Sequence, residues 1–561
     1  MQVQLLGVLH GARGPGQDLI LARLRGAKAE YTGVVDGMSG SPVYIGNKLL
    51  GSISYRIGAF SKEPIAGITP IEQMLEVQNL PSSNLTSIAA QTASLAPNPA
   101  SGLNLPAAPQ NTLSSGNMNF QAIETPLVMS GFQPDAIRFW QQHTAGTALN
   151  QIAAGGMLSA PAGSSSASDA VVPPSAAHPA LEPGSAVSMQ LIRGDLEVAA
   201  TCTVTYIDPK QLLACGHPVL GAGPISLPMT TADVVTTLAS PMDAFKIINT
   251  GVTIGAFTQD RESAIRGVLG AQARMIPMHV SIDAPGGPRK VNVEILDLPS
   301  LTPLAMQVVL LQSLLESNES SDMLSYHVTG NVDLSGFPSV PLDVWASAGD
   351  SAPSSLMAAL LAGEHFSKIY TNDARQGAVR EIDLHVQALP RSVQVALVQA
   401  RVVSTDIVHA GDIIQVEATL RPWQQPERNL RIPIKLPDRL EPGNLRLLVS
   451  DAATLDRTLL QPHFPAPPAD LATVLTEARD QHAADRVYVS LLAPETQGEL
   501  RGQTLTSLPL SVANALEPLR ASQDAGLNGE SAEIAAEASA GGVLSGFQIL
   551  TVHIDPGGGL N

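Results

Sequence analysis

The chain has 561 residues, more than one hydrophobic core can organise, so we expect about three to five domains. Its 32 Lys and Arg residues against 50 Asp and Glu residues give a net charge of −18, and no basic run could follow a phosphate backbone, which argues against nucleic acid as a partner. No apolar run reaches the roughly 18 residues that span a bilayer, which argues against an integral membrane segment. The low contents of aromatic (4%) and charged (15%) residues favour β-rich domains joined by linkers over a helical bundle.

Strand periodicity and linker composition divide the chain into segments. Runs of Ser, Asn, Pro, Ala and Thr without periodicity mark residues 81–118 and 161–182 as linkers. The expected order is a strand-rich segment at 1–80, the first linker, a small bridging segment at 119–160, the second linker, a strand-rich segment at 183–300, a mixed helix and strand segment at 301–375, a β-sandwich-like domain at 376–463 and an α+β segment at 464–561.

The most distinctive motif is Gly-Met-Ser-Gly-Ser-Pro at residues 37–42. The glycines around Ser39 permit a tight turn that directs the hydroxyl and the surrounding N–H groups toward one place, which is how a nucleophilic serine is presented. Residues 43–53 then read as a strand, a polar turn and a second strand. The alternative is a surface loop rich in glycine and serine, because six-residue matches of this kind arise by chance.

Two further segments have helical patterns. Residues 69–76 predict a short helix with Thr69 as its N-cap, Pro70 at the first helical position and Glu72 completing a capping box. Residues 302–316 repeat apolar side chains at helical spacing and predict a second helix.

The two cysteines flank a predicted hairpin. Cys202 and Cys215 are equally distant from an Asp-Pro turn at residues 208–209, so pairing of the two strands places them opposite each other. Cross-strand neighbours lie about 4.5–5.5 Å apart at Cα, which is within disulfide reach. We expect a disulfide and hence an oxidising compartment. The alternative is two small buried side chains in a reducing compartment.

Among the twelve histidines, His217 has the most defined setting. It lies between Gly216 and Pro218, at the end of the strand that returns from the predicted hairpin. A histidine in such a turn can direct its ring into a cleft. The alternative is a turn histidine whose ring is satisfied by a backbone carbonyl.

Together these segments resemble the SpoIVB-type serine peptidases, a sporulation-signalling branch of the trypsin-like enzymes. The matching blocks are residues 32–68, residues 203–218, residues 251–255 and residues 265–267. The resemblance implies a mainly β fold with a trypsin-like double β-barrel, in which residues 1–80 form the serine-bearing half and residues 183–300 the histidine-bearing half. In that family the histidine segment precedes the serine segment, so the order in this chain implies a circular permutation. The alternative is that the two blocks are separate pieces and no site forms.

The resemblance implies a serine endopeptidase that acts on a protein or peptide substrate. Ser39 is then the nucleophile and His217 the general base. The N–H groups of Gly37 and Ser39 are the expected oxyanion donors, by analogy with trypsin-like loops. No cofactor is implied.

The third catalytic residue is not fixed by the resemblance, because the family's aspartate falls at Leu24 in this chain. Asp260 lies in the histidine-bearing half and is the first candidate, and Asp18 is the second. A Ser–His dyad is the remaining alternative. Asp36 is so close to the serine in sequence that we expect it to stabilise the loop instead.

Other features bear on ligands and compartment. No group of His, Cys and Asp has metal-ligand spacing, and the Gly-rich residues 11–16 lack the lysine of a phosphate loop. The first residues lack the basic region and long apolar core of a signal peptide, so the extracellular or cell-envelope location that the disulfide implies requires a leader upstream of this sequence. The competing function class is a catalytically inactive, peptidase-like surface or interaction protein.

Overall fold

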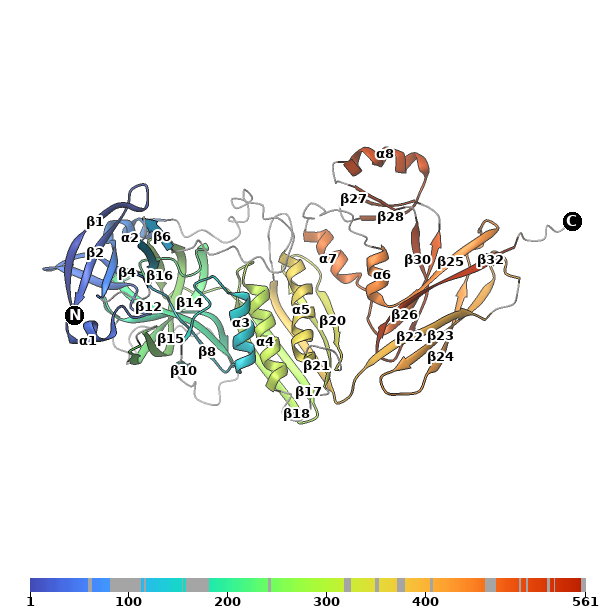
Figure 1. Cartoon of the computed structure of the whole chain (residues 1–561), viewed down its shortest axis with the longest axis horizontal. Coiled ribbons are helices and arrows are strands. Elements are labelled where there is room, and N and C mark those ends of the chain that lie inside the picture. The colour runs from blue at the N-terminus through green and yellow to red at the C-terminus, as the bar shows by residue number, and fades with distance from the viewer. Residues whose placement is uncertain are drawn as a thin grey trace. The chain divides into compact units, whose positions relative to one another are not determined.

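The computed structural model describes residues 1–58, 63–80, 112–115, 118–153, 155–157, 181–240, 244–316, 324–348, 353–370, 379–403, 407–459, 471–493, 496–500, 503–521, 525–528 and 530–555. The chain forms two compact units, one of Met1–His279 and Val291–Gln312 and the other of Val280–Lys290 and Ser313–Asn561. The molecule is mainly β, as the composition predicts (Figure 1). Most of the two expected linkers, namely residues 81–111, 116–117 and 161–180, lies outside the described residues.

The first sheet of the N-terminal unit carries the serine motif. Its elements are β1 (Gln2–Gly14), β2 (Gln17–Arg25), α1 (Ala27–Thr32), β3 (Ser41–Ile45), β4 (Lys48–Ile57), β5 (Ile65–Pro70), α2 (Ile71–Gln78), β6 (Thr112–Ser115) and β7 (Met118–Ala122). The strands pair in the order β1-β2-β5-β4-β7-β6, with β3 on β4. The predicted strand, turn and strand after the serine motif are confirmed, because β3 and β4 pair around Gly46, whose φ of +61° suits glycine.

The second sheet of this unit contains a closed ring. The ring strands are β11 (Ala186–Gly194), β12 (Glu197–Ile207), β13 (Gln211–Ala214), β14 (Gly223–Leu238), β15 (Phe245–Arg261) and β16 (Ala264–Leu269). In the described part of the chain these six strands pair antiparallel in the order β11-β14-β15-β16-β13-β12, and β12 pairs back onto β11. Ring closure satisfies the backbone groups that an open sheet leaves at its edges. His217 lies in the loop between β13 and β14.

The predicted bridging segment joins both sheets. Its elements are β7, β8 (Leu127–Ser130), α3 (Pro134–His143), β9 (Ile152–Ala153) and β10 (Gly155–Met157). Strand β7 pairs with β4 of the first sheet, whereas β8 pairs with β12 of the ring. Residues 112–115 were expected in the linker, but they form strand β6, which gains backbone hydrogen bonds by pairing with β7.

The two predicted helices are present, and one begins later than expected. Pro70 is the N-cap of α2, and no side chain caps this helix, so the assignment of Thr69 as N-cap was wrong. Thr69 belongs to β5 instead, and its hydroxyl donates a hydrogen bond of 2.8 Å to the carbonyl of Gly216. Helix α4 spans Thr302–Glu316, as predicted. This helix and the strands β17 (Met275–Ala284) and β18 (Gly287–Leu296) contain residues of both units.

The C-terminal unit continues with helices and mostly antiparallel strands. Its elements are β19 (Ser325–Leu334), β20 (Val340–Ala346), α5 (Ser354–Tyr370), β21 (Val379–Leu389), β22 (Gln394–Val402), β23 (Ile413–Pro422), β24 (Arg428–Lys435), β25 (Gly443–Ser450), α6 (Ala452–Leu459), α7 (Leu471–Arg479), β26 (Arg486–Ala493), β27 (Thr496–Leu500), β28 (Gln503–Leu508), α8 (Leu510–Ala521), β29 (Ala525–Asn528), β30 (Ser531–Ser539), β31 (Val543–Ser545) and β32 (Phe547–Ile554). None of the described helices is long and apolar enough to cross a membrane.

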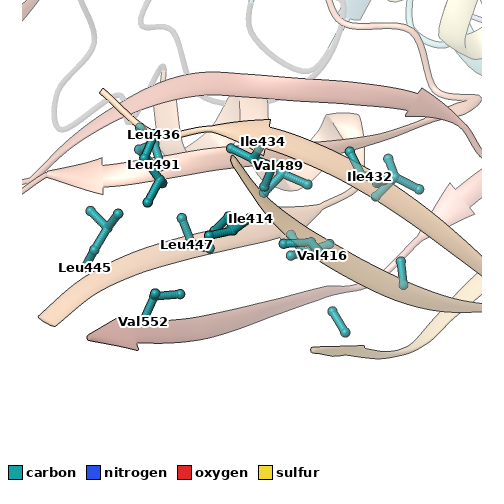
Figure 2. Packing of buried hydrophobic residues seen from close by; sticks show 14 of the residues in the cluster. Ile414, Val416, Ile432, Ile434, Leu436, Leu445, Leu447, Val489, Leu491 and Val552 are labelled. Carbon is teal, nitrogen blue, oxygen red and sulfur yellow. The ribbon is translucent and has the colours of Figure 1, made fainter. Parts of the chain in front are cut away.

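Two sheets of the C-terminal unit share one hydrophobic core. One sheet has the order β24-β23-β22-β31 and the other the order β30-β26-β25-β32. Figure 2 shows Ile414 and Ile432 of the first sheet beside Leu447, Val489 and Val552 of the second, all in one cluster of buried side chains. The alternation of buried and exposed residues along β24 and β25 provides these apolar faces. The core therefore draws on both of the segments expected at 376–463 and 464–561.

Candidate active site

The Ser39 loop connects α1 to β3 and turns on glycines. Gly37 and Gly40 have φ values of +86° and +92°, which side-chain-bearing residues rarely adopt. A Cβ on Gly40 would lie 1.9 Å from the carbonyl oxygen of Thr203 and 2.7 Å from the amide nitrogen of Cys215. Glycine at this position therefore lets the Ser39 loop contact both the ring strand β12 and the start of the histidine loop.

Strand β12 holds the Ser39 loop through backbone and hydroxyl groups. The Thr203 N–H donates to the Ser39 carbonyl at 2.9 Å. The Thr203 hydroxyl donates to the Gly37 carbonyl at 3.2 Å, and the Thr205 hydroxyl to the Gly40 carbonyl at 2.7 Å. These hydroxyls lie on one face of β12 because alternate residues of a strand point the same way. The ring strand thus fixes the backbone on both sides of Ser39.

The His217 loop begins with a disulfide and another tight turn. Cys202 of β12 and Cys215 are joined at an S–S distance of 2.05 Å, with their Cα atoms 5.3 Å apart. Cys215 and Gly216 both have positive φ, at +65° and +77°. A Cβ on Gly216 would lie 2.0 Å from the hydroxyl oxygen of Ser54, so glycine permits close packing against β4 of the serine-bearing sheet.

The His217 ring is buried and held by a backbone carbonyl. Its Nδ1 lies 2.8 Å from the Pro218 carbonyl oxygen, which can only accept, so Nδ1 carries the proton and Nε2 has a lone pair. Burial lowers the pKa of His217 to about 4, against the opposing effect of the Pro218 and Ile123 carbonyls. His217 is therefore neutral at pH 7, with Nε2 in the form that accepts a proton.

Within the described residues, the Ser39 hydroxyl and His217 Nε2 are both buried and without a hydrogen-bond partner. The side chains are 0% and 2% exposed. Ser39 Oγ and His217 Nε2 have no hydrogen-bond partner within the described residues, so they do not bond to each other in this structure. The two loops nonetheless meet, because Gly40 packs on the Cys215 amide. The structure thus brings the two predicted segments together without forming the Ser–His hydrogen bond.

Asp260 supports the His217 loop and does not orient the ring. Its Oδ1 accepts the Val219 N–H at 2.9 Å, and its Oδ2 accepts the N–H groups of Leu220 at 2.6 Å and Gly221 at 2.9 Å. Burial raises the pKa of Asp260 to about 6, against the opposing effect of these N–H groups. The backbone carbonyl of Pro218, not a carboxylate, occupies the position beside Nδ1 that the third residue of a triad takes. This corrects the expectation that Asp260 contacts the ring.

The other two aspartates also have assigned partners. Asp18 lies on the exposed β1–β2 hairpin, 2.9 Å from His10 Nδ1, and the Gly11 N–H and then His10 hold its pKa below the usual range. It is not a partner of His217. Asp36 is fully buried and accepts the Glu124 N–H at 3.2 Å, so it stabilises the serine loop as expected.

One of the two predicted oxyanion donors is already engaged. The Gly37 N–H donates to the Glu124 carbonyl at 3.0 Å. This carbonyl follows the bridging strand β7, which the sequence pattern could not place next to the serine motif. Gly37 therefore does not offer a free N–H in this structure, and Ser39 is the predicted oxyanion donor that remains.

The structure adds neighbours of the site that the sequence did not indicate. The Tyr55 ring approaches the His217 ring edge-on, with centroids 6.5 Å apart. Arg13 donates to the Tyr55 hydroxyl at 3.1 Å, and its charge contributes to lowering the pKa of His217. Arg13 is in the Gly-rich residues 11–16, which therefore form a hairpin tip beside the site. Lys246 of β15 donates to the Gly37 carbonyl at 2.8 Å.

Searches of protein-family models, of curated proteins and of solved structures found no match to this chain. The site is therefore characterised by its geometry and by its residue types. These are a serine and a neutral histidine, both buried, on loops that close glycine contacts bring together.

Proposed function

We propose that this chain is a serine endopeptidase of trypsin-like architecture, with Ser39 as nucleophile and His217 as general base. The observation that carries the proposal is the state of His217. Its Nδ1 is committed to the Pro218 carbonyl, and its Nε2 is left as an unpaired proton acceptor beside a loop with an unpaired serine hydroxyl. A buried hydroxyl and a buried ring nitrogen without partners are costly, and a catalytic role for both groups accounts for that cost.

The architecture supports the same proposal. The closed antiparallel ring formed by β11–β16 carries His217, as the histidine-bearing barrel half of a trypsin-like enzyme would. The sheet containing β1–β5 carries Ser39 and supplies the second half. In this interpretation the chain is a circularly permuted form of the SpoIVB-type peptidases, because the serine half comes first. Permutation is compatible with catalysis since catalytic triads occur in several chain orders.

The proposed reaction uses groups from both loops. Ser39 Oγ attacks the scissile carbonyl carbon as its proton moves to His217 Nε2, and the C–N bond breaks as the imidazolium gives this proton to the leaving amine. A water molecule deprotonated by His217 then releases the acyl group from Ser39 and restores the serine. The carbonyls of Pro218 and Ile123 favour the imidazolium, which compensates in part for burial. The Ser39 N–H stabilises the oxyanion. Asp260 contributes by fixing the loop that carries the ring. The site is thus a Ser–His dyad with a backbone carbonyl in the third position.

The proposal requires a movement of the two side chains. Ser39 and His217 are buried and not bonded to each other. Catalytic hydrogen bonds often tighten only in the complex with substrate. Substrate binding must therefore open access to Ser39 and close the Oγ to Nε2 distance to about 3 Å.

The disulfide and the C-terminal unit complete the proposal. A Cys202–Cys215 bond persists in an oxidising compartment, so the enzyme acts outside the cell or in the cell envelope. The two sheets that share the core of Figure 2 form a β-sandwich-like domain that positions the enzyme or binds its target.

A non-catalytic surface or interaction protein is the second candidate. The observation in its favour is that Ser39 is 0% exposed and makes no hydrogen bond to His217. In that case the glycine contacts would serve only to hold the two sheets together, and the disulfide would only tie β12 to the His217 loop.

A fluorophosphonate probe distinguishes the two candidates, because it reacts covalently with an activated serine. The wild-type protein should be labelled, and peptide mapping should place the label on Ser39. The variants Ser39→Ala and His217→Ala should not react. Ser281→Ala is the control, since Ser281 lies in β17, outside both loops, and its hydroxyl donates to the Leu384 carbonyl at 3.2 Å. This control should be labelled like the wild type. A folded wild-type protein that is not labelled, or unchanged labelling of Ser39→Ala, would rule out the peptidase assignment.

A further inference from the structure

Lys246 contacts the serine loop with its backbone and its side chain. Its N–H donates to the Asp36 carbonyl at 3.3 Å, and its ammonium donates to the Gly37 carbonyl at 2.8 Å and lies 3.3 Å from the Thr203 hydroxyl. Its methylene groups come within 3.5 to 3.8 Å of the position that a Cβ on Gly37 would take. The side chain therefore covers the peptide that lies two residues before Ser39.

The ammonium of Lys246 has no carboxylate partner in the described part of the chain. Lys246 contacts Asp36 through the backbone, and the charge of Lys28 acts on its ammonium. The carboxylate of Asp36 accepts the Glu124 N–H and lies 3.5 Å from Arg56, which in turn lies 3.3 Å from the Glu124 carboxylate. Lys28 of α1 adds a like charge. Burial, and then Lys28, lower the pKa of Lys246 to about 8.

A buried lysine without a carboxylate partner loses hydration and gains no ion pair. Its hydrogen bonds to the Gly37 carbonyl and the Thr203 hydroxyl are therefore the contacts that offset this cost. A charge-assisted hydrogen bond is about twice as strong as a neutral one. The Gly37 carbonyl accepts such a bond from the Lys246 ammonium and a second bond from the Thr203 hydroxyl. Gly37 itself, at a φ of +86°, has no side chain that restricts its backbone, so the conformation of the loop depends on such external contacts.

We propose that Lys246 is a positioning residue for Ser39, whose charged amine fixes the Gly37 carbonyl and thereby aims the serine hydroxyl. The proposal rests on the proposed peptidase function and adds a residue from the histidine-bearing half to the serine loop. Its consequence is that the reactivity of Ser39 depends on the charge of Lys246. A merely space-filling role would not produce this dependence.

The test is the rate of fluorophosphonate labelling of Ser39 measured from pH 6 to pH 10. In the wild type the rate should fall as Lys246 loses its proton near pH 8. Lys246→Met keeps the length of the side chain without its charge and should react about 100-fold more slowly at pH 7, the size of effect expected when a reacting group is displaced by about 1 Å. Lys246→Arg keeps the charge at every pH, so its rate should stay within about tenfold of the wild type and show no alkaline fall.

Two further variants separate charge from folding. Lys28→Gln leaves every contact of Lys246 in place but removes the like charge, so the alkaline fall should move to higher pH. This shift tests whether labelling depends on the charge of Lys246 even if Lys246→Arg does not fold. Lys210→Met, a change at a hairpin turn of the ring, should label like the wild type at every pH.

The possible failures point to different conclusions. A wild type that is not labelled contradicts the proposed function and this inference with it. A wild type that is labelled, together with a folded Lys246→Met protein of equal rate or an alkaline fall that Lys28→Gln does not move, contradicts the role of Lys246 alone.

Discussion

The Ser39 loop and the His217 loop are alike where they pack and different in what supports them. Each contains a glycine at positive φ, Gly40 or Gly216, whose Cβ would overlap a neighbouring segment. Hydroxyls of β12 and an ammonium group support the Ser39 loop. A disulfide and the carboxylate of Asp260 support the His217 loop. The His217 loop should therefore be sensitive to redox state and to acid, whereas the Ser39 loop depends on hydroxyl and ammonium donors from the ring.

The close glycine contact that both loops share gives the largest expected loss of stability. Gly40→Ala would combine strained backbone with a Cβ 1.9 Å from the Thr203 carbonyl oxygen, so we expect the free energy of unfolding to fall by about 3–5 kcal/mol and labelling to disappear. The control is Gly46→Ala, which has positive φ but no atom within 4 Å of the new Cβ and should lose only about 1–2 kcal/mol. Denaturant unfolding measures both. Equal losses in the two variants would show that the loop contact is not tight.

Redox state should separate the two loops. Replacing both Cys202 and Cys215 by alanine should lower the free energy of unfolding by about 3 kcal/mol, since a disulfide that closes a short loop stabilises by that amount. Thr205→Val, on the serine side, removes one hydrogen bond to the Gly40 carbonyl and should cost about 1 kcal/mol. Denaturation with and without reductant checks this. Reductant should destabilise Thr205→Val as much as the wild type but leave the double alanine variant unchanged. Any other pattern would contradict the independence of the disulfide and the Thr205 hydrogen bond.

Acid should act on the histidine side through two opposing groups. The pKa of His217 falls on folding from 6.5 to about 4. Between these two pH values the unfolded chain binds a proton on His217 that the folded chain does not bind. The free energy of unfolding therefore decreases as the pH falls from 6.5 to about 4, by up to about 3 kcal/mol. The pKa of Asp260 rises on folding from 3.8 to about 6, so its contribution is fully present below pH 3.8 and is lost as the pH rises through 6.

Variants resolve these two contributions. His217→Gln should reduce the loss of stability on acidification, and Asp260→Asn should make that loss steeper because the opposing group is gone. The measurement is the free energy of unfolding at intervals from pH 4 to pH 7. A pH dependence that neither variant alters would mean that other groups control the acid stability of the loop.

The smallest effect is expected at Asp18, which lies on an exposed hairpin away from the His217 ring. Asp18→Asn changes an exposed hairpin pair, so neither the denaturation midpoint nor the labelling rate should move. Asp260→Asn removes one acceptor for the N–H groups of the His217 loop and should slow labelling about tenfold, as for loss of one hydrogen bond of about 1.4 kcal/mol. A larger effect of Asp18→Asn than of Asp260→Asn on the labelling rate would reverse their assigned roles.

The sequence predicted the local features of the site and not its long-range contacts. The hairpin after Ser39 and the setting of His217 follow from glycine, proline and alternation over a few residues. The partners of Asp260 could not be predicted, because they depend on the register of β14 against β15. Lys246 lies in a strand where a lysine usually faces solvent, so nothing marked it. The engagement of the Gly37 N–H depends on the bridging segment, which is distant in sequence.

The central claim is that Ser39 and His217 act as one site across the two loops. A crystal structure of the fluorophosphonate-treated protein tests it most directly. We expect a bond from phosphorus to Ser39 Oγ and a His217 Nε2 about 2.6–3.2 Å from an oxygen of the adduct. An adduct on another residue, or a His217 ring that remains more than about 8 Å from the phosphonyl group, well beyond hydrogen-bond reach, would contradict it.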